Sequence, residues 1–162
     1  MESIILNKIQ INQKIMRIAY QIYECHLNQN ELIIAGIADN GFILAKRIQK
    51  ALQAISPLKV SICEVTIDKK KPLNPIITSL NAVEYQNKSL VLVDDVLNSG
   101  TTLMYVVKHF LEVPLTQFKT AVLVDRNHKK YPVKADFKGI SLSTSLREHV
   151  QVDFESNKVT LI

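Results

Sequence analysis

The sequence predicts an α/β fold built on a central parallel sheet with helices on its faces. Segments with helical apolar spacing alternate along the chain with short, continuous apolar runs of strand length. The runs within 31–37 and 90–93 are apolar at consecutive positions, which is typical of strands covered on both faces in a parallel sheet. The length of 162 residues fits one domain, and we expect residues 1–162 to form it.

The first predicted helix covers about residues 11–27, and Asn7 or Asn12 is available as its N-cap. Four isoleucines recur there at positions i, i+4, i+7 and i+11, which places them on one helical face. They are Ile11, Ile15, Ile18 and Ile22. A buried strand is predicted next, over 31–37. It ends in the turn-forming sequence 38–41, which reads Ala-Asp-Asn-Gly.

A second helix is predicted over about 42–54, where apolar residues return to helical spacing. These residues are Leu44, Ala45, Ile48 and Leu52. The apolar run 60–67 predicts a second strand. Residues 68–80 hold three lysines and two prolines without a clear period, so we expect a loop there. The continuous apolar run 90–93 predicts a third buried strand.

The second half of the chain continues the alternation and then changes character. A third helix is predicted over 101–111, with Leu103, Val106, Val107 and Phe110 on one face. Another buried strand follows over 120–124. After Asp125 the pattern consists of short strand-like pieces, and 150–154 and 159–162 are expected to pair as a terminal hairpin.

Composition and charge restrict the classes of partner. The sequence has no apolar run long enough for a transmembrane helix and no signal-peptide pattern at its start, so we expect a cytoplasmic protein without a membrane partner. Cys25 and Cys63 show neither metal-ligand spacing nor a disulfide framework. The net charge of +5 favours anionic partners, either phosphorylated metabolites or nucleic acid, or is simply a mildly basic surface.

The segment Asp94–Thr102 carries the most specific chemical signal. It follows a predicted parallel strand and precedes a helix, where open α/β sheets bind ligands. The helix N-terminus presents unpaired amides and partial positive charge, which suits a phosphate. Gly100 lets the backbone approach a ligand closely. Asn98, Ser99, Thr101 and Thr102 complete this candidate phosphate site.

The two carboxylates at the start of this segment suit a different group. Asp94 and Asp95 repel a phosphate, but they can accept hydrogen bonds from vicinal hydroxyls, and carboxylates bind Mg²⁺. A phosphate cradle beside a diol acceptor matches a ribose phosphate. A plainer interpretation is that the acids end a strand and the hydroxyl residues cap a helix. The string is neither a Walker A loop nor a dinucleotide-binding glycine motif.

The string resembles the phosphoribosyl-pyrophosphate signature of type I phosphoribosyltransferases. Further segments resemble one branch, the pyrimidine-operon attenuation regulators that also act as uracil phosphoribosyltransferases. These segments are Gly36–Gly41, Leu44–Arg47, Ala121–His128, Tyr131–Phe137 and Ser143–Ser145. The resemblance spans roughly residues 11–154. It implies the type I phosphoribosyltransferase fold, with a small hood formed by the chain after Asp125.

The resemblance also implies a reaction and a set of roles. A nucleobase would displace pyrophosphate from C1 of phosphoribosyl pyrophosphate, with Mg²⁺ as cofactor, in a homodimer or homotetramer. Asp94 and Asp95 would be the catalytic carboxylates and would accept hydrogen bonds from the ribose hydroxyls. Residues Asn98–Thr102 would bind the 5′-phosphate. The remaining implied roles are the pyrophosphate loop for Ala38, Asp39, Asn40 and Gly41, base contacts for Phe137 and Arg126, and a hood ligand to Mg²⁺ for Asp153 or Glu155. For Phe137 the alternative is core packing, and for Arg126 and His128 it is a solvated turn.

Two departures from the family pattern leave a second function open. The pyrophosphate loop normally carries a cation, but here Asp39 and Asn40 replace it. Lys69–Lys71 either supply the missing charge or belong to a solvated loop. A regulatory protein that senses a nucleotide or phosphoribosyl pyrophosphate, with little turnover, is therefore the alternative to an active uracil enzyme. RNA binding is a further possibility, although Met16 and Tyr20 replace residues that contact RNA in the regulators.

Overall fold

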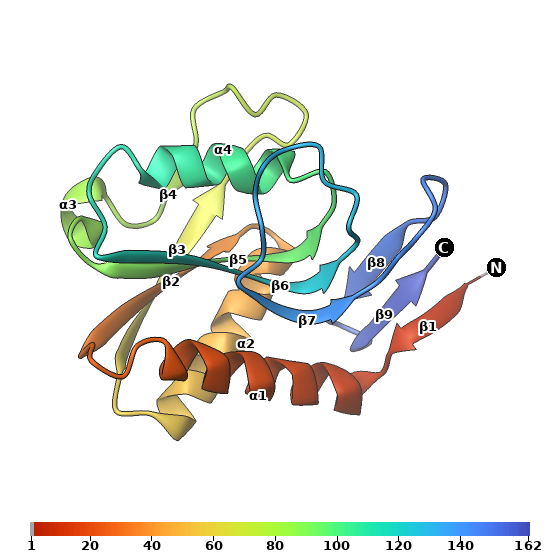
Figure 1. Ribbon diagram of the computed structural model, residues 1–162, viewed down its shortest axis with the longest axis horizontal. Helices are drawn as coiled ribbons and strands as arrows, with labels where there is room; N and C mark the ends of the chain where they lie inside the picture. Colours follow the sequence, from red (N-terminus) through yellow and green to blue (C-terminus); the bar gives the residue numbers. More distant parts are fainter. Residues whose placement is uncertain (1) are drawn as a thin grey trace.

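The computed structural model describes residues 2–162 and places two sheets side by side (Figure 1). The larger sheet has six strands in the order β4-β3-β2-β5-β6-β7, and the smaller has three in the order β1-β9-β8. The larger sheet is parallel throughout except for the pairing of β4 with β3 at one edge. The predicted α/β class with a central parallel sheet is confirmed. No helix among the described residues has both the length and the apolar character that crossing a bilayer requires.

Strands and helices alternate through most of the chain. The strands are β1 (Ser3–Leu6), β2 (Glu31–Ile37), β3 (Lys59–Thr66), β4 (Ile77–Thr78), β5 (Ser89–Leu97), β6 (Gln117–Asp125), β7 (Phe137–Ser141), β8 (Val150–Asp153) and β9 (Lys158–Leu161). The helices are α1 (Lys8–Glu24), α2 (Asn40–Ile55), α3 (Ala82–Tyr85) and α4 (Thr101–Phe110).

The central strands are buried on both faces because helices cover each side (Figure 1). In β2, Leu32 and Ile34 pack with α1 and α2, whereas Ile33, Ala35 and Ile37 pack with α4 and α3. Alternate residues of an apolar strand point to opposite faces, so a continuous apolar run fills two cores at once. This arrangement explains why the buried strands show no apolar and polar alternation in the sequence.

The helix boundaries differ modestly from those that periodicity predicts. α1 begins three residues earlier than predicted because Asn7 caps it, and it also ends three residues earlier. The Asn7 side chain accepts from the Gln10 amide at 2.9 Å, and the Gln10 side chain accepts from the Asn7 amide at 2.9 Å. This reciprocal pair is a capping box, which fixes where the helix starts.

Three elements were not predicted from the sequence. β4 lies inside the segment expected to be a loop, α3 follows it, and β1 lies at the N-terminus. β4 and β1 are only two and four residues long, so neither shows a period that sequence reasoning can detect. The terminal hairpin is confirmed as β8 and β9, and β1 extends it to a third strand.

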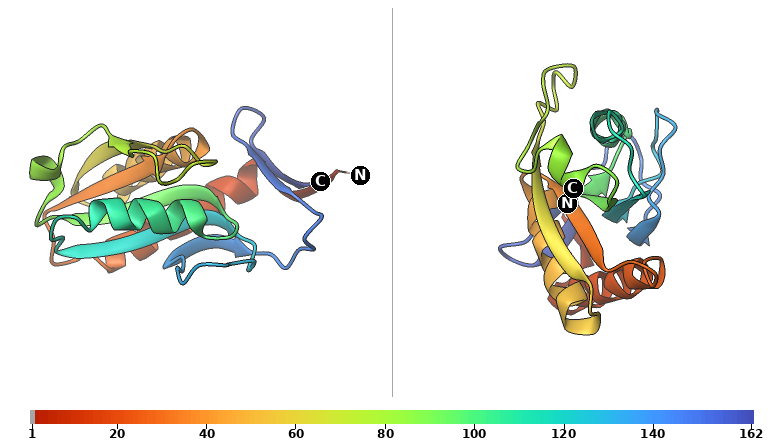
Figure 2. Two further views of the ribbon diagram at one scale, coloured as in Figure 1. Left: turned by 90° about the horizontal axis from the view of Figure 1, so that it is seen from above. Right: turned by 90° about the vertical axis from the view of Figure 1, so that its left-hand side faces the viewer.

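The small sheet of β1, β9 and β8 forms a hood at the end where β5, β6 and β7 terminate (Figure 2). Arg47 of α2 anchors it, donating to the Asn157 side chain at 2.8 Å and to the Phe154 carbonyl at 3.1 Å. Its guanidinium also lies 4.7 Å from the centre of the Phe154 ring. The hood is therefore held against the carboxyl ends of the parallel strands, where ligands bind in such sheets.

Candidate active site

The predicted phosphate segment forms a tight loop between β5 and α4. Gly100 is the residue before the helix and has φ 88°, a left-handed conformation that side chains other than glycine rarely adopt. The Ser99 and Thr101 hydroxyl oxygens are 2.8 Å apart, and the Thr101 amide donates to Ser99 Oγ at 3.3 Å. Gly100 has no side chain to cap α4, so the amides that follow Thr101 in the first turn are available to an anion.

The chain after β6 holds this loop in place. The amides of Lys130 and Tyr131 donate to the Ser99 carbonyl at 2.7 and 3.2 Å, and the Arg126 amide donates to the Leu97 carbonyl at 3.1 Å. A Cβ on Gly100 would lie 2.6 Å from Val133 Cγ1. The requirement for glycine at this position therefore comes from the backbone angle and from the neighbouring loop as well as from space for a ligand.

The acidic pair lies inside β5, which is four residues longer at its end than the sequence suggested. Asp94 is buried, and the Asp95 amide donates to its Oδ1 at 2.9 Å. The Val96 amide donates to Asp95 Oδ1 at 2.8 Å. Burial first, and the neighbouring Asp95 charge second, raise the pKa of Asp94 well above its usual value. The Asp94 carboxyl is therefore more readily protonated than an ordinary one, and a cation beside the pair would favour its charged form.

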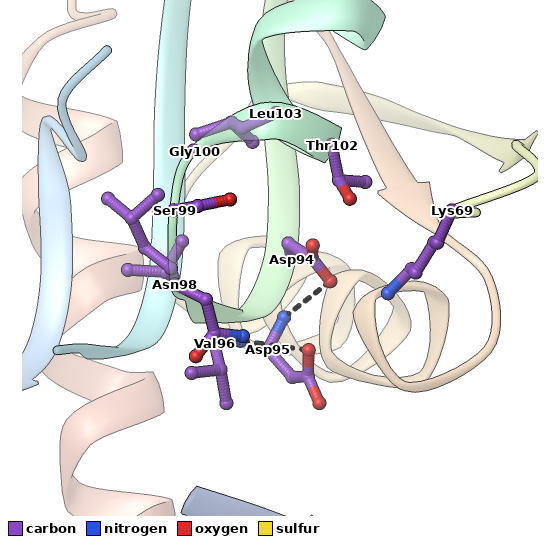
Figure 3. Close-up of a pocket in the computed structure, with 11 residues that line it drawn as sticks. Lys69, Asp94, Asp95, Val96, Asn98, Ser99, Gly100, Thr102 and Leu103 are labelled. Carbon is purple, nitrogen blue, oxygen red and sulfur yellow. Dashed lines mark hydrogen bonds between the residues drawn. The ribbon is translucent and has the colours of Figure 1, made fainter. Parts of the chain in front are cut away.

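Lys69 brings positive charge to the same pocket from the loop after β3. Figure 3 shows its side chain directed toward the acidic pair, and its charge opposes the rise in the pKa of Asp94. Lys69 is exposed and also lines the cavity, so it is the lysine of Lys69–Lys71 that is placed to supply positive charge to the site. Sequence reasoning cannot join Lys69 to Asp94, because folding alone brings together two segments that lie 25 residues apart.

Together these residues line a small cavity of about 100 Å³ that is partly open to solvent. Its lining consists of Lys69, Asp94, Asp95, Val96, Leu97, Asn98, Ser99, Gly100, Thr102, Leu103 and Val122 (Figure 3). The structure thus gathers the predicted phosphate loop and the acidic pair around one space. Thr101 does not line it directly but contacts Ser99.

The turn Ala38–Gly41 lies against the acidic pair. A Cβ on Gly41 would lie 2.8 Å from the Val93 carbonyl oxygen and 3.0 Å from Asp94 Oδ1, so glycine allows this close approach. The peptide bond between Ala38 and Asp39 is cis. The Asp39 side chain is exposed and makes no capping bond to α2. The predicted pyrophosphate loop therefore adjoins the predicted ribose site.

Asn40 connects this turn to the acidic pair and to the hood. Its side-chain amide nitrogen donates to Asp95 Oδ2 at 3.1 Å and to the Val152 carbonyl at 2.9 Å. Through this one side chain, the turn after β2 is bonded to the end of β5 and to strand β8. In the sequence, Asn40 is notable only because it replaces the family's cation. Its bonds to Asp95 and to the hood cannot be predicted from the sequence.

Arg126 organises the segment after β7 and does not line the cavity. Its guanidinium donates to Asn98 Oδ1 at 2.9 Å, to Thr144 Oγ1 at 3.1 Å, and to the carbonyls of Ser145 and Glu148. His128 Nε2 contacts the Thr144 carbonyl. Every guanidinium nitrogen thus has a partner within the protein. Arg126 is therefore buried in a network of bonds within the protein, and a base contact for it stays a prediction.

Phe137 and Asp153 both make contacts within the protein. Phe137 is 6% exposed and packs in the core beneath α1, because its position in β7 faces that helix. Its burial favours the core-packing alternative, and a base contact for Phe137 stays a prediction. The Asp153 carboxylate accepts from the amides of Glu155 and Ser156 and from the Ser156 hydroxyl, which closes the β8–β9 turn. These bonds lower the pKa of Asp153.

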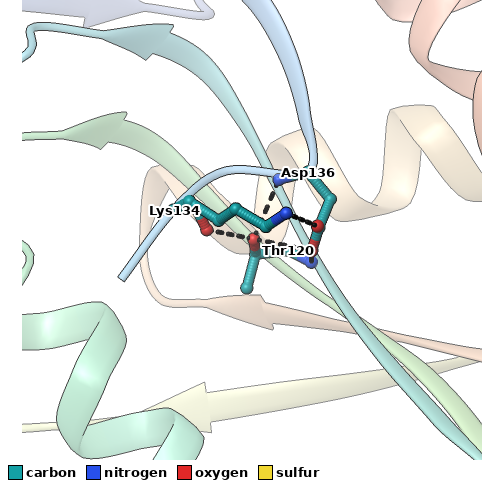
Figure 4. A network of polar contacts seen from close by, with 3 residues as sticks. All are labelled: Thr120, Lys134 and Asp136. Atoms are coloured by element: carbon teal, nitrogen blue, oxygen red, sulfur yellow. Dashed lines mark hydrogen bonds and ion pairs between the residues drawn. The ribbon is translucent and has the colours of Figure 1, made fainter. Parts of the chain in front are cut away.

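A polar network fixes the chain between β6 and β7. The Thr120 amide donates to Asp136 Oδ2 at 2.9 Å, and the Asp136 amide donates to Thr120 Oγ1 at 3.1 Å (Figure 4). The Thr120 hydroxyl also donates to the Lys134 carbonyl. Thr120 is buried, so these bonds satisfy polar groups that water does not reach. The network holds residues 134–136, which lead directly into β7, against strand β6.

The donor set fits Mg²⁺ only in part. No group of three or more metal-ligating side chains gathers anywhere in residues 2–162. The acidic pair offers two carboxylates, and proteins commonly bind Mg²⁺ through one or two carboxylates together with substrate phosphates. Asp94 and Asp95 therefore suit a magnesium ion that arrives with a phosphorylated substrate.

Comparisons with known proteins agree with this geometry. A model of the phosphoribosyl transferase domain matches residues 2–157. The bifunctional protein PyrR of Streptococcus agalactiae is 30% identical over 155 residues, covering 92% of this chain and 88% of the relative. The corresponding protein of Streptococcus sanguinis is 32% identical over the same coverage.

Solved structures of low sequence identity share the fold. The hypoxanthine phosphoribosyltransferase of Trypanosoma cruzi superposes with a TM-score of 0.81 at 15% identity, covering 98% of this chain and 95% of that chain. A hypoxanthine-guanine phosphoribosyltransferase of Bacillus anthracis gives 0.72 at 19% identity, covering 88% and 83%. The predicted type I phosphoribosyltransferase fold with a small hood is confirmed. With a phosphate loop and an acidic pair at the end of its parallel sheet, this chain belongs to the phosphoribosyl transferase domain family.

Proposed function

We propose that this protein transfers ribose 5-phosphate from phosphoribosyl pyrophosphate to a nucleobase, and that the base is uracil. The observation that carries the proposal is the placement of the α4 phosphate loop and the Asp94–Asp95 pair around one cavity. Family membership supports the reaction class, and the similarity to PyrR proteins over 92% of the chain supports the choice of uracil.

The proposed reaction is a substitution at C1 of the ribose. The bond from C1 to the pyrophosphate oxygen breaks and its electrons leave with pyrophosphate, while a base nitrogen forms the new bond and loses its proton. Positive charge develops on the ribose ring as the leaving group departs. Asp94 and Asp95 stabilise that charge and accept hydrogen bonds from the ribose hydroxyls.

The phosphate loop fixes the other end of the substrate. The first amides of α4 and the hydroxyls of Ser99, Thr101 and Thr102 bind the 5′-phosphate. Arg126 holds Asn98 in this loop through its bond to Oδ1. Asp94 or Asp95 would hold a Mg²⁺ ion, which would supply positive charge to the pyrophosphate group. Binding both ends of the sugar phosphate orients C1 toward the incoming base.

One observation favours a second function. Asn40 occupies the position of the family's cation, and its amide already bonds to Asp95 and to the hood. A loop without positive charge binds the leaving pyrophosphate weakly. The second candidate is therefore a regulatory protein that binds phosphoribosyl pyrophosphate or a nucleotide and turns over little.

The decisive experiment combines an activity assay with a binding panel. The protein is incubated with phosphoribosyl pyrophosphate, radiolabelled uracil and Mg²⁺, and UMP formation is followed, with hypoxanthine and guanine as alternative bases. Binding of phosphoribosyl pyrophosphate, UMP and GMP is measured by calorimetry with and without Mg²⁺. UMP formation supports the enzyme. Tight binding without any nucleotide product supports the regulatory protein, and no binding of any of these ligands contradicts both.

A further inference from the structure

Asn98, the first residue after β5, uses one end of its side-chain amide within the protein and leaves the other end free. Its Oδ1 accepts from Arg126 Nη1 at 2.9 Å. An arginine carries only donors, so Asn98 has to turn its amide oxygen toward Arg126 and its amide nitrogen away from it. Within residues 2–162 the structure gives Asn98 Nδ2 no hydrogen-bond partner, and Asn98 is exposed and lines the cavity. The site therefore offers a ligand an uncharged N–H donor.

Arg126 is held firmly enough to impose that orientation on Asn98. It is buried, and its guanidinium also donates to Thr144 Oγ1 at 3.1 Å and to the carbonyls of Ser145 and Glu148. If the Asn98 amide were flipped, its hydrogens would face those of Arg126, and a buried N–H of the guanidinium would lose its acceptor. Donor chemistry thus decides the direction of Asn98 Nδ2.

The same bond directs the Asn98 side chain away from the rest of the phosphate loop. The Ser99 and Thr101 hydroxyls contact each other at the start of α4, where the free amides of the helix lie. Asn98 bonds instead to the residue that directly follows β6. The hydroxyl residues therefore face the phosphate position, whereas Asn98 faces the neighbouring strand.

The strand order separates the two sides of the acidic pair. The turn Ala38–Gly41 follows β2 and Lys69 follows β3, both on one side of β5, whereas β6 and β7 lie on the other side. Figure 3 shows Lys69 and Asn98 on opposite sides of Asp94. In a substitution at carbon, the entering group approaches opposite to the leaving group, and the site has to align both. Pyrophosphate on the side of Lys69 therefore leaves the side of Asn98 to the base.

From these observations we propose that Asn98 recognises the base: its Nδ2 donates to a ring carbonyl oxygen of the base, and Arg126 is the positioning residue that orients it. The inference rests on the proposed transferase function and adds to it the contact that selects the base. Uracil carries carbonyl oxygens at C2 and C4, so it offers the acceptor that an N–H donor requires. Hypoxanthine and guanine also carry a ring carbonyl, whereas adenine has none, so Asn98 selects against adenine.

Calorimetry with UMP and with ribose 5-phosphate tests the contact, because the two ligands share the sugar phosphate and differ in the base. The main variant is Asn98→Asp, which keeps an oxygen for Arg126 and replaces the N–H donor with an acceptor. We expect the ratio of UMP affinity to ribose 5-phosphate affinity to fall at least ~10-fold, as for a lost hydrogen bond and an unpaired carbonyl. The added charge acts on the phosphate of both ligands, so it cancels in the ratio. An unchanged ratio overturns the proposal.

Thr102→Val is the matched contrast, because Thr102 lines the cavity from the phosphate loop. Its loss should weaken UMP and ribose 5-phosphate in the same proportion. If Asn98→Asp behaves in that way too, Asn98 is a phosphate ligand and the proposal fails. Circular dichroism and the melting temperature check that both variants fold. If the natural protein binds neither ligand, the proposed function itself fails, and this outcome is distinguishable because it involves no variant.

Steady-state kinetics separate base recognition from structural damage. Asn98→Ala removes the donor without adding charge, so it should raise KM for uracil ~10-fold and change KM for phosphoribosyl pyrophosphate by less than about 2-fold. Arg126→Lys keeps the charge but loses the planar fork that orients Asn98, so it should also raise KM for uracil selectively. Damage to the fold alone lowers the active fraction without this split. Equal increases in both KM values overturn the proposal.

Discussion

The side chain of Asn40 bonds at once to Asp95 Oδ2 and to the carbonyl of Val152 in the hood. The family's usual cation at this position would meet a carboxylate on one side and a carbonyl on the other. Asn40 makes the same two contacts without adding charge. The positive charge that the family pattern offers to pyrophosphate is therefore missing from this turn.

Restoring the cation should strengthen binding of phosphoribosyl pyrophosphate. We expect the double variant Asp39→Thr, Asn40→Arg to lower its KM by roughly 5- to 150-fold, because a like charge is removed and an opposite one is added, about 1–3 kcal/mol. Steady-state kinetics at low and high salt measure this effect, which should shrink with salt. UMP affinity should change little, because UMP leaves the pyrophosphate position empty.

Asn40→Ala is the control for that variant. It removes both hydrogen bonds without adding charge, so it should lower stability by about 1 kcal/mol and leave KM unimproved. An unchanged KM in the arginine variant would indicate that Lys69 already binds the pyrophosphate. The argument for a regulatory protein with little turnover would then fail.

Gly100→Val should abolish phosphate binding and also destabilise the fold. Reasoning from the sequence alone expects lost binding in a stable chain, but a Cβ here meets Val133 at 2.6 Å on a backbone with φ 88°. We expect a loss of about 1–3 kcal/mol, measured by urea unfolding. Adding Val133→Ala should recover part of the stability by removing the clash, while sulfate binding stays lost. Full stability of Gly100→Val would contradict the observed loop geometry.

The acidic pair should be essential for transfer but not for phosphate binding. We expect Asp94→Asn with Asp95→Asn to remove UMP formation, because the amides still hydrogen-bond but carry no charge to stabilise a cationic ribose. Affinity for inorganic phosphate should be equal or higher, since two negative charges near the phosphate loop are gone. Product assays and phosphate calorimetry measure both effects. Retained transfer activity would show that the proposed charge stabilisation is wrong.

The buried Asp94 should make stability depend on pH. Its pKa in the folded protein lies above the unfolded value, because of burial first and the Asp95 charge second. The folded state is therefore favoured while Asp94 is protonated, and stability is lost as pH rises through the folded-state pKa. Asp94→Asn removes this loss, so its melting temperature should exceed that of the natural protein most at high pH.

Thermal melts from pH 5 to pH 8, in EDTA to exclude bound cations, measure that difference. Each pKa unit corresponds to about 1.4 kcal/mol, or roughly 3–5 °C for a chain of this size. Asp95→Asn should give a smaller gain, because it removes the neighbouring charge and leaves Asp94 buried. A difference that is constant across this pH range would show that Asp94 does not titrate there.

The sequence by itself determined the fold class and the chemical core of the site. Continuous apolar runs and helical periodicity depend on local backbone geometry, so the main strands and helices were readable within a few residues. The phosphate loop and the acidic pair are contiguous in the chain, and one segment therefore revealed both.

Only the tertiary structure decided the roles of residues whose partners are distant in sequence. Lys69 reaches the acidic pair, Asn40 joins Asp95 to the hood, and Arg126 clamps Asn98 and the chain near Thr144. Phe137 is buried because β7 faces α1, which no local pattern reveals. Such contacts depend on how strands are ordered and how loops fold back. The sequence determines that order, but the order cannot be recognised from local patterns. The interacting groups come together only when the chain packs its core.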